Sequence, residues 1–177
     1  SRSVPDRPVD PGQTGRFYFA GAKHDMRLSD IIVTEAIVPE LQAKTRDEAI
    51  HELVEALAEA GAIPRKSIKD IAKAVLAREA QATTGIGKGV ALPHTKVKGI
   101  KQPVATIGRS SEGIDFGALD SKPVYSVILL LSSPDNPDEH LQAMEAIFKH
   151  VQRDIFRKFL RQSETREAIW DLIQEAD

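Results

Sequence analysis

The stretch from Arg78 to His94, REAQATTGIGKGVALPH, most limits what this chain can fold into. Three glycines alternate in it at positions 85, 87 and 89, and glycine lets a backbone turn through positive φ without steric cost. Pro93 fixes its own φ and keeps Leu92 extended, so His94 does not lie inside a helix. The sequence therefore predicts a tight turn, a short extended run, and an imidazole at the end of that run.

The same stretch is suited to binding an anion. Successive N–H groups of a glycine-rich turn can form a nest for phosphate, and a nearby histidine could carry a phosphoryl group. The residues alone leave open that His94 is only a hydrogen-bonded side chain and that the turn is only a turn. Lys88 adds a positive charge to the turn. This charge could serve phosphate binding or contact with a donor protein, and the sequence does not distinguish the two. The pattern departs from both common nucleotide-binding glycine loops.

Two helices are predicted before this stretch. Thr45 and Glu48 form a capping-box pattern, apolar residues then recur at helical spacing, and Gly61 is placed to end the helix. Ser67 and Asp70 repeat the capping pattern for the second helix. The predicted buried face of that helix carries four residues at i, i+3, i+4 and i+7, namely Ile71, Ala74, Val75 and Arg78.

This spacing predicts that Arg78 reaches the threonine-glycine turn from the buried side of its helix. Two interpretations follow from the residue type. The arginine can extend along the apolar surface or pair with an acid such as Glu79. Alternatively, its guanidinium is directed at a phosphoryl group, because the planar fork matches phosphate oxygens.

Two strands are predicted after His94, over residues 104–107 and 124–131, with a loop or hairpin between them. The second strand is almost entirely apolar, which is typical of a strand covered on both faces. Helices therefore alternate with short strands, and this order predicts an α/β fold.

Two further helices are predicted in the last third of the chain. The first begins at about Pro137, and its apolar stripe consists of Leu141, Met144, Phe148 and Val151. His140 lies in its first turn, where free N–H groups favour an anion, and His150 is expected at the surface. The final helix is expected from about Glu164 to Glu175, with Trp170 anchoring it to the core.

Length and composition limit the function classes. The 177 residues suffice for one domain with a sizeable core. A net charge of −2 without a Lys/Arg run predicts no nucleic-acid partner. No apolar run is long enough to insert into a membrane, no cysteine is present, and the first residues lack the apolar core of a signal peptide. A cytoplasmic location is therefore expected.

The N-terminal residues have a different composition from the rest. Ser1–Asp25 is rich in proline, glycine and charge, and it is expected to be a flexible extension. Its aromatic patch Phe17-Tyr18-Phe19 could dock locally, and His24 is expected to be solvated. Residues 26–177 then form a single domain without internal repeats.

The pattern R-E-x-Q-x-T-T-G-I-G-x-G-V-A-L-P-H, over Arg78 to His94, resembles a family signature. It is similar to the phosphorylation site of the fructose/mannitol-type enzyme IIA (EIIA, type 2) domains of the bacterial phosphoenolpyruvate-dependent phosphotransferase system. That family includes the nitrogen-regulatory IIA proteins. A second, shorter match is His140-Leu141-Gln142 after two prolines. The resemblance extends from Met26 to about Ile173.

The resemblance implies a mixed central β-sheet with helices on both faces. It implies that His94 accepts a phosphoryl group from an HPr-like phosphohistidine protein and passes it to a IIB-type (EIIB) acceptor. His140 would hydrogen-bond or polarise the phosphoryl group, and Arg78 would stabilise its charge. Three residues would position the imidazole or the oxygens, namely Thr83, Thr84 and Gly85. No metal or other cofactor is implied.

Two alternatives of other classes remain at this point. A regulatory IIA protein would use the same phosphorylation to control binding to a partner, without sugar transport. A metal site would use His94, His140 and an acid, but the histidines lack the tight spacing that metal ligands usually have.

Overall fold

The computed structural model describes residues 25–177, so the predictions for His24 and for Phe17-Tyr18-Phe19 lie outside the described residues. The helices are α2 (Leu28–Ile31), α3 (Arg46–Glu59), α4 (Ile68–Gln81), α5 (Pro137–Val151), α6 (Asp154–Gln162) and α7 (Arg166–Ala176), with short 3-10 turns at η1 (Thr34–Ala36) and η2 (Arg65–Ser67). The strands are β1 (Gly85–Gly87), β2 (Val90–Ala91), β3 (His94–Lys96), β4 (Val104–Ile114) and β5 (Val124–Ser132).

Strand β5 is the centre of the sheet, and it determines where His94 lies. It pairs antiparallel with β4 on one side and parallel with β2 and then β3 on the other, while β1 pairs with β2. Val90 lies opposite Ser126, and His94 lies opposite Leu130. Strands β2 and β3 thus follow β5 in one line, interrupted at Leu92 and Pro93.

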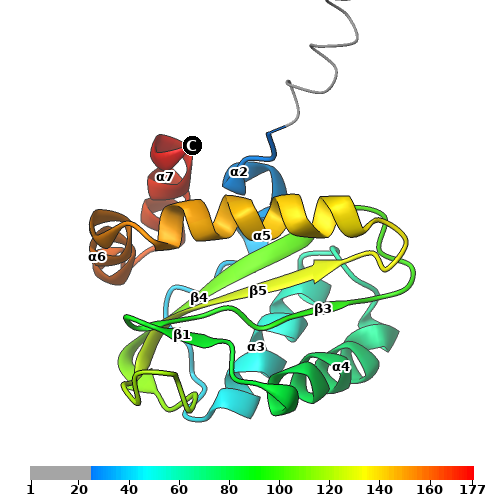
Figure 1. The fold of residues 1–177 in the computed structure, drawn as a ribbon, viewed down its shortest axis with the longest axis horizontal. Helices are drawn as coiled ribbons and strands as arrows, with labels where there is room; N and C mark the ends of the chain where they lie inside the picture. The colour runs from blue at the N-terminus through cyan, green and yellow to red at the C-terminus, as the bar shows by residue number, and fades with distance from the viewer. Residues whose placement is uncertain (1–24) are drawn as a thin grey trace, which may run out of the picture.

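Helices cover both faces of this mixed sheet, so the predicted α/β architecture is confirmed (Figure 1). Helices α3 and α4 cover one face, where Leu129 and Leu131 of β5 join their core. Helices α2, α5, α6 and α7 contribute to the core on the other face, with Ile128 and Leu130. Because β5 is buried on both sides, its sequence is continuously apolar instead of alternating.

Helix α3 begins and ends where the sequence predicts. The Thr45 hydroxyl accepts a hydrogen bond from the Glu48 N–H at 3.2 Å, and Gly61 has a φ of +80° just beyond the helix. The predicted cap at Ser67 is wrong, because Ser67 makes no side-chain capping bond and is itself helical. The extended residue Pro64 precedes η2, so the chain enters helical geometry before Ser67.

In the second half of the chain one helix was missed, and three predictions are wrong, namely the end of the first strand, the burial of Leu141 and the exposure of His150. Strand β4 continues to Ile114 instead of ending at Ile107, and α6 was not predicted at all. On α5, Leu141 is 59% exposed, and the buried positions are Ala143, Ala146, Ile147, His150 and Val151. His150 is 2% exposed, because its ring stacks on Phe156 of α6. The final helix and a half-buried Trp170 packed on the core are as predicted.

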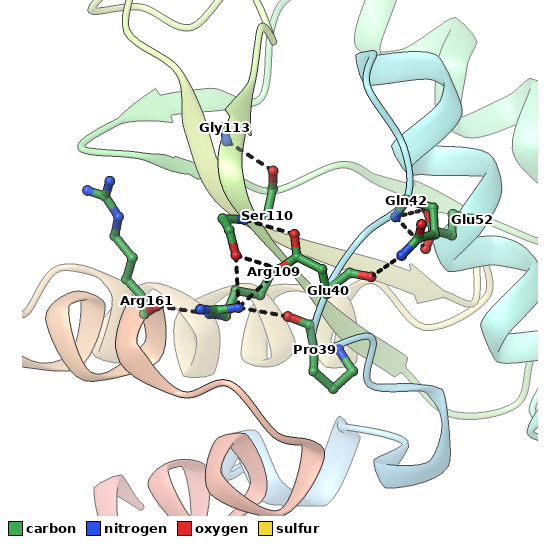
Figure 2. A network of polar contacts seen from close by, with 9 residues as sticks. Pro39, Glu40, Gln42, Glu52, Arg109, Ser110, Gly113 and Arg161 are labelled. Carbon is green, nitrogen blue, oxygen red and sulfur yellow. Dashed lines mark hydrogen bonds and ion pairs between the residues drawn. The ribbon is translucent and has the colours of Figure 1, made fainter.

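A buried arginine joins α6 to the sheet. Arg109 of β4 is 7% exposed, and its Nε donates to the carbonyl of Arg161 at 2.9 Å (Figure 2). Its Nη1 donates to the carbonyl of Pro39 at 3.0 Å and to the Glu40 carboxylate at 3.2 Å. The charge of Arg109 is therefore paired and hydrogen-bonded, as a buried charge requires. This network holds the last turn of α6 against β4.

Candidate functional site

His94 is the first residue of β3, and a hydrogen bond between its ring and the backbone of Leu92 holds it there. Its Nδ1 lies 2.8 Å from the carbonyl oxygen of Leu92. A carbonyl can only accept, so Nδ1 carries the hydrogen of a neutral ring and Nε2 carries the lone pair. The arrangement leaves Nε2 as the nucleophilic atom of His94.

The surroundings of His94 keep its ring neutral. Burial lowers the pKa of His94 below the ordinary value, and the carbonyl of Leu92 acts in the opposite direction. The positive charge of Arg78 also lowers this pKa, while the negative charge of Glu79 raises it. With a pKa below 6.5, the imidazole is unprotonated at neutral pH and can attack an electrophile.

His140 lies beside His94 although 45 residues separate them in the sequence. The ring centroids are 5.8 Å apart, and the rings are tilted by 44°. His140 is in the first turn of α5, and its Nδ1 is hydrogen-bonded to the Ser132 hydroxyl at the end of β5. Burial lowers the pKa of His140, with further contributions from the charges of His94 and Lys96. The structure thus brings the two predicted histidines together.

Arg78 reaches the site by a different route from the predicted one. The buried positions of α4 are Ile71, Ala72, Val75 and Glu79, so the predicted buried stripe ending at Arg78 is wrong. Arg78 is half-buried, and its Nη1 donates to the carbonyl of Ala82 at 3.1 Å. The bond closes the end of α4 and holds the guanidinium where its charge acts on His94.

Glu79 is a residue of the site that the sequence analysis missed. Its carboxylate is 2% exposed and accepts two bonds from Thr84, from the N–H at 3.0 Å and from the hydroxyl at 2.6 Å. The available signal was its position four residues after Val75, which continues the buried face of α4. Glu79 anchors the chain that leads into β1 and places a negative charge near His94.

Thr83 and Gly85 hold the same segment against the loop before β5. The Thr83 hydroxyl donates to the carbonyl of Phe116 at 3.1 Å and accepts from the Gly85 N–H at 3.0 Å. A Cβ on Gly85 would lie 2.8 Å from the Cβ of Ala118, so only glycine allows this approach. The hydroxyls of Thr83 and Thr84 are thus hydrogen-bonded to other residues of the chain, and they stabilise the segment that leads to His94.

The glycine turn does not lie beside His94, and the prediction of an anion nest there is wrong. Its tip is Lys88, with a φ of +58°, and Gly89 accepts from the N–H of Tyr125 at the start of β5. His94 pairs four residues further along β5 than Val90 does, which corresponds to about 13 Å. The anion bound by this turn is the carboxylate of Asp120, 3.0 Å from the Lys88 N–H.

Two further properties of the described chain bear on the predictions. Within residues 25–177, no group of three or more His, Asp or Glu side chains is arranged to hold a metal ion. In the same residues, each helix is too short or too polar to span a bilayer.

The mixed sheet covered by helices on both faces matches the fold of solved IIA structures. Residues 30–176 match the family "Phosphoenolpyruvate-dependent sugar phosphotransferase system, EIIA 2". The match covers more than half of the chain, and the chain belongs to this family. Its EIIA domains act as phosphoryl carriers.

Relatives of two kinds are similar to the chain. A fructose-specific EIIA component from Haloferax volcanii is 33% identical over 149 residues, which cover 84% of this chain and 95% of the relative. A nitrogen regulatory protein from Bradyrhizobium diazoefficiens is 30% identical, again with 84% and 95% covered. The fructose-specific EIIABC component of Bacillus subtilis is 31% identical, but the chain spans only 24% of its length.

Solved structures show the same fold. Nitrogen regulatory protein IIA-Ntr from Neisseria meningitidis superposes with a TM-score of 0.74 at 25% identity, covering 82% of this chain and 98% of that protein. The complex of enzyme IIAMtl with phosphorylated enzyme IIBMtl from Escherichia coli gives 0.66 at 21% identity, with 80% and 95% covered. At 21% identity, the similarity to the IIAMtl–IIBMtl complex concerns the fold alone.

Proposed function

We propose that the protein is a phosphoryl carrier whose Nε2 of His94 accepts a phosphoryl group from an HPr-like phosphohistidine protein. The phosphoryl group then passes to an EIIB-type acceptor. The observation that carries this proposal is the bond from Nδ1 of His94 to the Leu92 carbonyl, because it leaves the lone pair of the neutral ring on Nε2. Family membership supports the reaction type.

The transfer exchanges one P–N bond for another. The P–N bond to the donor imidazole breaks and its electron pair stays on the donor, while the lone pair of Nε2 forms the new bond. The ring of His94 gains positive charge as it becomes phosphorylated. The Leu92 carbonyl stabilises this charge, because it already accepts from Nδ1. No hydrolysis or metal is required by this route.

Arg78 and His140 stabilise the phosphoryl oxygens in the proposed reaction. Both carry nitrogen donors close to His94, and transfer of this kind depends on positioning and on charge stabilisation. Ser132 orients the ring of His140 through Nδ1, so that Nε2 of His140 is left for the phosphoryl oxygens. Thr83, Thr84 and Gly85 act indirectly by holding the segment next to His94, with Glu79 as their anchor.

A regulatory function is the second candidate. It is supported by the IIA-Ntr structure, with its TM-score of 0.74, and by the relative named as a nitrogen regulatory protein. In this case the phosphorylation of His94 switches the affinity for a target protein. The chemistry of the first transfer is the same, and only the second partner differs.

Phosphorylation of the protein by a phosphorylated HPr-type donor, followed by intact mass, tests the proposal. The parent protein is expected to gain one phosphoryl group that is labile in acid and stable in alkali. His94→Ala should gain none, and His140→Ala should keep the fold while transfer slows by about 10²–10⁴-fold. Undiminished labelling of His94→Ala would refute the assignment. Addition of an EIIB domain then separates the candidates, because only a transport component passes the phosphoryl group on.

A further inference from the structure

A cleft of about 900 Å³ lies at the end of the sheet away from His94. The β1–β2 turn, the start of β5 with the loop before it, Arg109 of β4, and helix α6 with the residues just after it line this cleft. Ser126 lines this cleft and His94 pairs with Leu130, so the two sites lie about 13 Å apart along β5. The proposed phosphoryl site therefore does not use this cleft.

The lining of this cleft is strongly basic. Its Lys and Arg side chains are Lys88, Arg109, Lys122, Arg157, Lys158 and Arg161. The acidic residues of the lining are Asp120 and Glu164. The whole chain has a net charge of −2, so this is a local concentration of positive charge. A concave wall of one charge sign raises the local concentration of small ions of the opposite sign.

Two of the basic residues are already neutralised, and four are available. Arg109 pairs with Glu40, and Arg157 pairs with Asp154. Within residues 25–177, no ion pair involves the other four, which are Lys88, Lys122, Lys158 and Arg161. The available positive charge therefore lies on two walls, with two lysines near the turn and two residues on α6.

Within residues 25–177, Asp120 forms no ion pair with the side chain of Lys88 or Lys122, although the charge of Lys122 helps to lower the pKa of Asp120. Its carboxylate accepts from the backbone N–H of Lys88 and from that of Lys122, each at 3.0 Å. These two bonds hold the pKa of Asp120 below its usual value, so it stays ionised and keeps both segments together. Asp120 thus bonds to the backbone of Lys88 and Lys122, and the side chains of these two lysines can contact a ligand.

Arg161 is fixed in place on the opposite wall. Its guanidinium lies over the ring of Tyr125, with 3.5 Å between Cζ and the ring centroid. Its carbonyl accepts from Arg109, and Figure 2 shows the side chain extending away from that network. A stacked guanidinium keeps its N–H edge for hydrogen bonds, and little rotamer freedom is left to lose on binding.

We propose that this cleft binds a small anion with two phosphate groups. One group contacts Lys88 and Lys122, and the other contacts Lys158 and Arg161. The cleft volume is within the range of small-molecule sites, about 300–1,000 Å³. The basic groups line a concavity instead of forming a stripe across the surface, which favours a compact anion over a nucleic acid.

Calorimetric titration of the full chain with inorganic pyrophosphate tests this site. One pyrophosphate is expected per chain, bound at least about tenfold more tightly than inorganic phosphate, because it spans both walls. Arg161→Gln should weaken pyrophosphate binding by about tenfold or more, the range of a lost charge-assisted contact. Lys149→Gln is the matched control, since it removes one positive charge from an exposed helical position outside the cleft. It should bind as the parent does.

A second variant tests the same wall in case Arg161→Gln does not fold. Lys158→Gln changes an exposed residue of the same wall and should weaken binding in the same direction. Absence of saturable binding, or equal binding by Arg161→Gln and Lys149→Gln, would overturn the proposal. So would tighter binding of a polyglutamate peptide or a single-stranded oligonucleotide than of pyrophosphate. His94→Ala should bind pyrophosphate like the parent, so this result does not depend on the phosphoryl-carrier proposal.

Discussion

The carbonyl of Leu92 determines which nitrogen of His94 can react. It accepts from Nδ1, so the lone pair of the neutral ring is on Nε2, and the same carbonyl stabilises a ring that becomes positively charged. Leu92 is placed by its N–H, which donates to the carbonyl of Thr84 at 3.0 Å. Glu79 holds Thr84 in turn. The tautomer of His94 thus depends on a chain of contacts that begins in helix α4.

The lowered pKa of His94 predicts how phosphoryl acceptance depends on pH. Because burial disfavours the protonated ring, the rate should fall to half its maximum at a pH below 6.5. The folded protein binds this proton less readily than the unfolded chain. The stability from His94 is therefore present above pH 6.5 and lost as pH falls through its lowered pKa. Initial rates from about pH 5 to 8 measure the pH dependence of acceptance, and an NMR titration of the imidazole over the same range measures the pKa of His94. Half-loss of the rate at or above pH 6.5 would contradict this.

Arg78 offers a prediction that separates charge from geometry. Arg78→Lys keeps the positive charge but loses the planar fork, so the rate of phosphoryl transfer should fall by about tenfold or more. The free energy of unfolding should change little, because the side chain is only half-buried. The thermal midpoint and the transfer rate are measured on the same sample. Transfer at the parent rate would show that the guanidinium has no special part.

The buried contact between Glu79 and Thr84 predicts a loss of stability. Thr84→Val keeps the side-chain shape but removes the hydroxyl, which leaves one Glu79 oxygen without its donor. The expected cost is about 1–3 kcal/mol in the free energy of unfolding, measured with urea. Thr34→Val is the matched control, because this half-buried threonine of η1 has no side-chain bond to residues 25–177. Equal stability of the two variants would refute the role of this contact.

At the scale of elements, caps and covered faces explain which parts were predictable. Helix α3 carries a threonine cap and a closing glycine, and β5 is apolar throughout because both faces are covered. Both patterns are local and both predictions are confirmed. Helix α6 was missed because it is short and leaves Ile155 and Phe159 exposed. On α5, Met144, Phe148 and Val151 pack on the core as predicted, whereas Leu141 is exposed and His150 is buried because α6 covers it.

The site was predictable in its residues more than in its geometry. The proline and the glycines place His94 at a strand end, and the loop before α5 places His140. The position of the glycine turn was not predictable, because it depends on which end of β5 the hairpin meets. The ligand of that turn, Asp120, lies 32 residues away from Lys88. Neither fact has a local signature.

The two helix starts provide a prediction for the elements themselves. Thr45→Ala removes a capping bond to the Glu48 N–H and should cost about 0.5–2 kcal/mol. Ser67→Ala should be close to neutral, because this hydroxyl caps nothing at the start of α4. Urea unfolding of both variants measures the difference. A larger loss from Ser67→Ala than from Thr45→Ala would contradict the assignment of the caps.

For the whole molecule, one carboxylate joins the two ends of the described chain. Asp177 accepts from the N–H of Leu28 at 3.1 Å and from that of Ser29 at 3.0 Å, which fixes the start of α2. Nε2 of the buried His150 donates to the same carboxylate at 3.1 Å. Figure 1 shows α2 and α7 on the same side of the sheet as α5. The layer over that face is thus closed by a contact between residues about 150 positions apart.

Asp177→Asn should therefore destabilise the whole domain by about 1–3 kcal/mol, since two N–H groups and a buried imidazole lose a charged acceptor. Burial raises the pKa of Asp177, but bonds from Ser29, His150 and Leu28 outweigh it and hold the pKa below 3.8. The stability from this carboxylate is present above pH 3.8 and lost as pH falls through the lowered pKa. Urea unfolding between about pH 3 and 7 should show a shallower acid dependence for Asp177→Asn than for the exposed control Asp171→Asn. Identical pH profiles would mean that this contact does not close the domain.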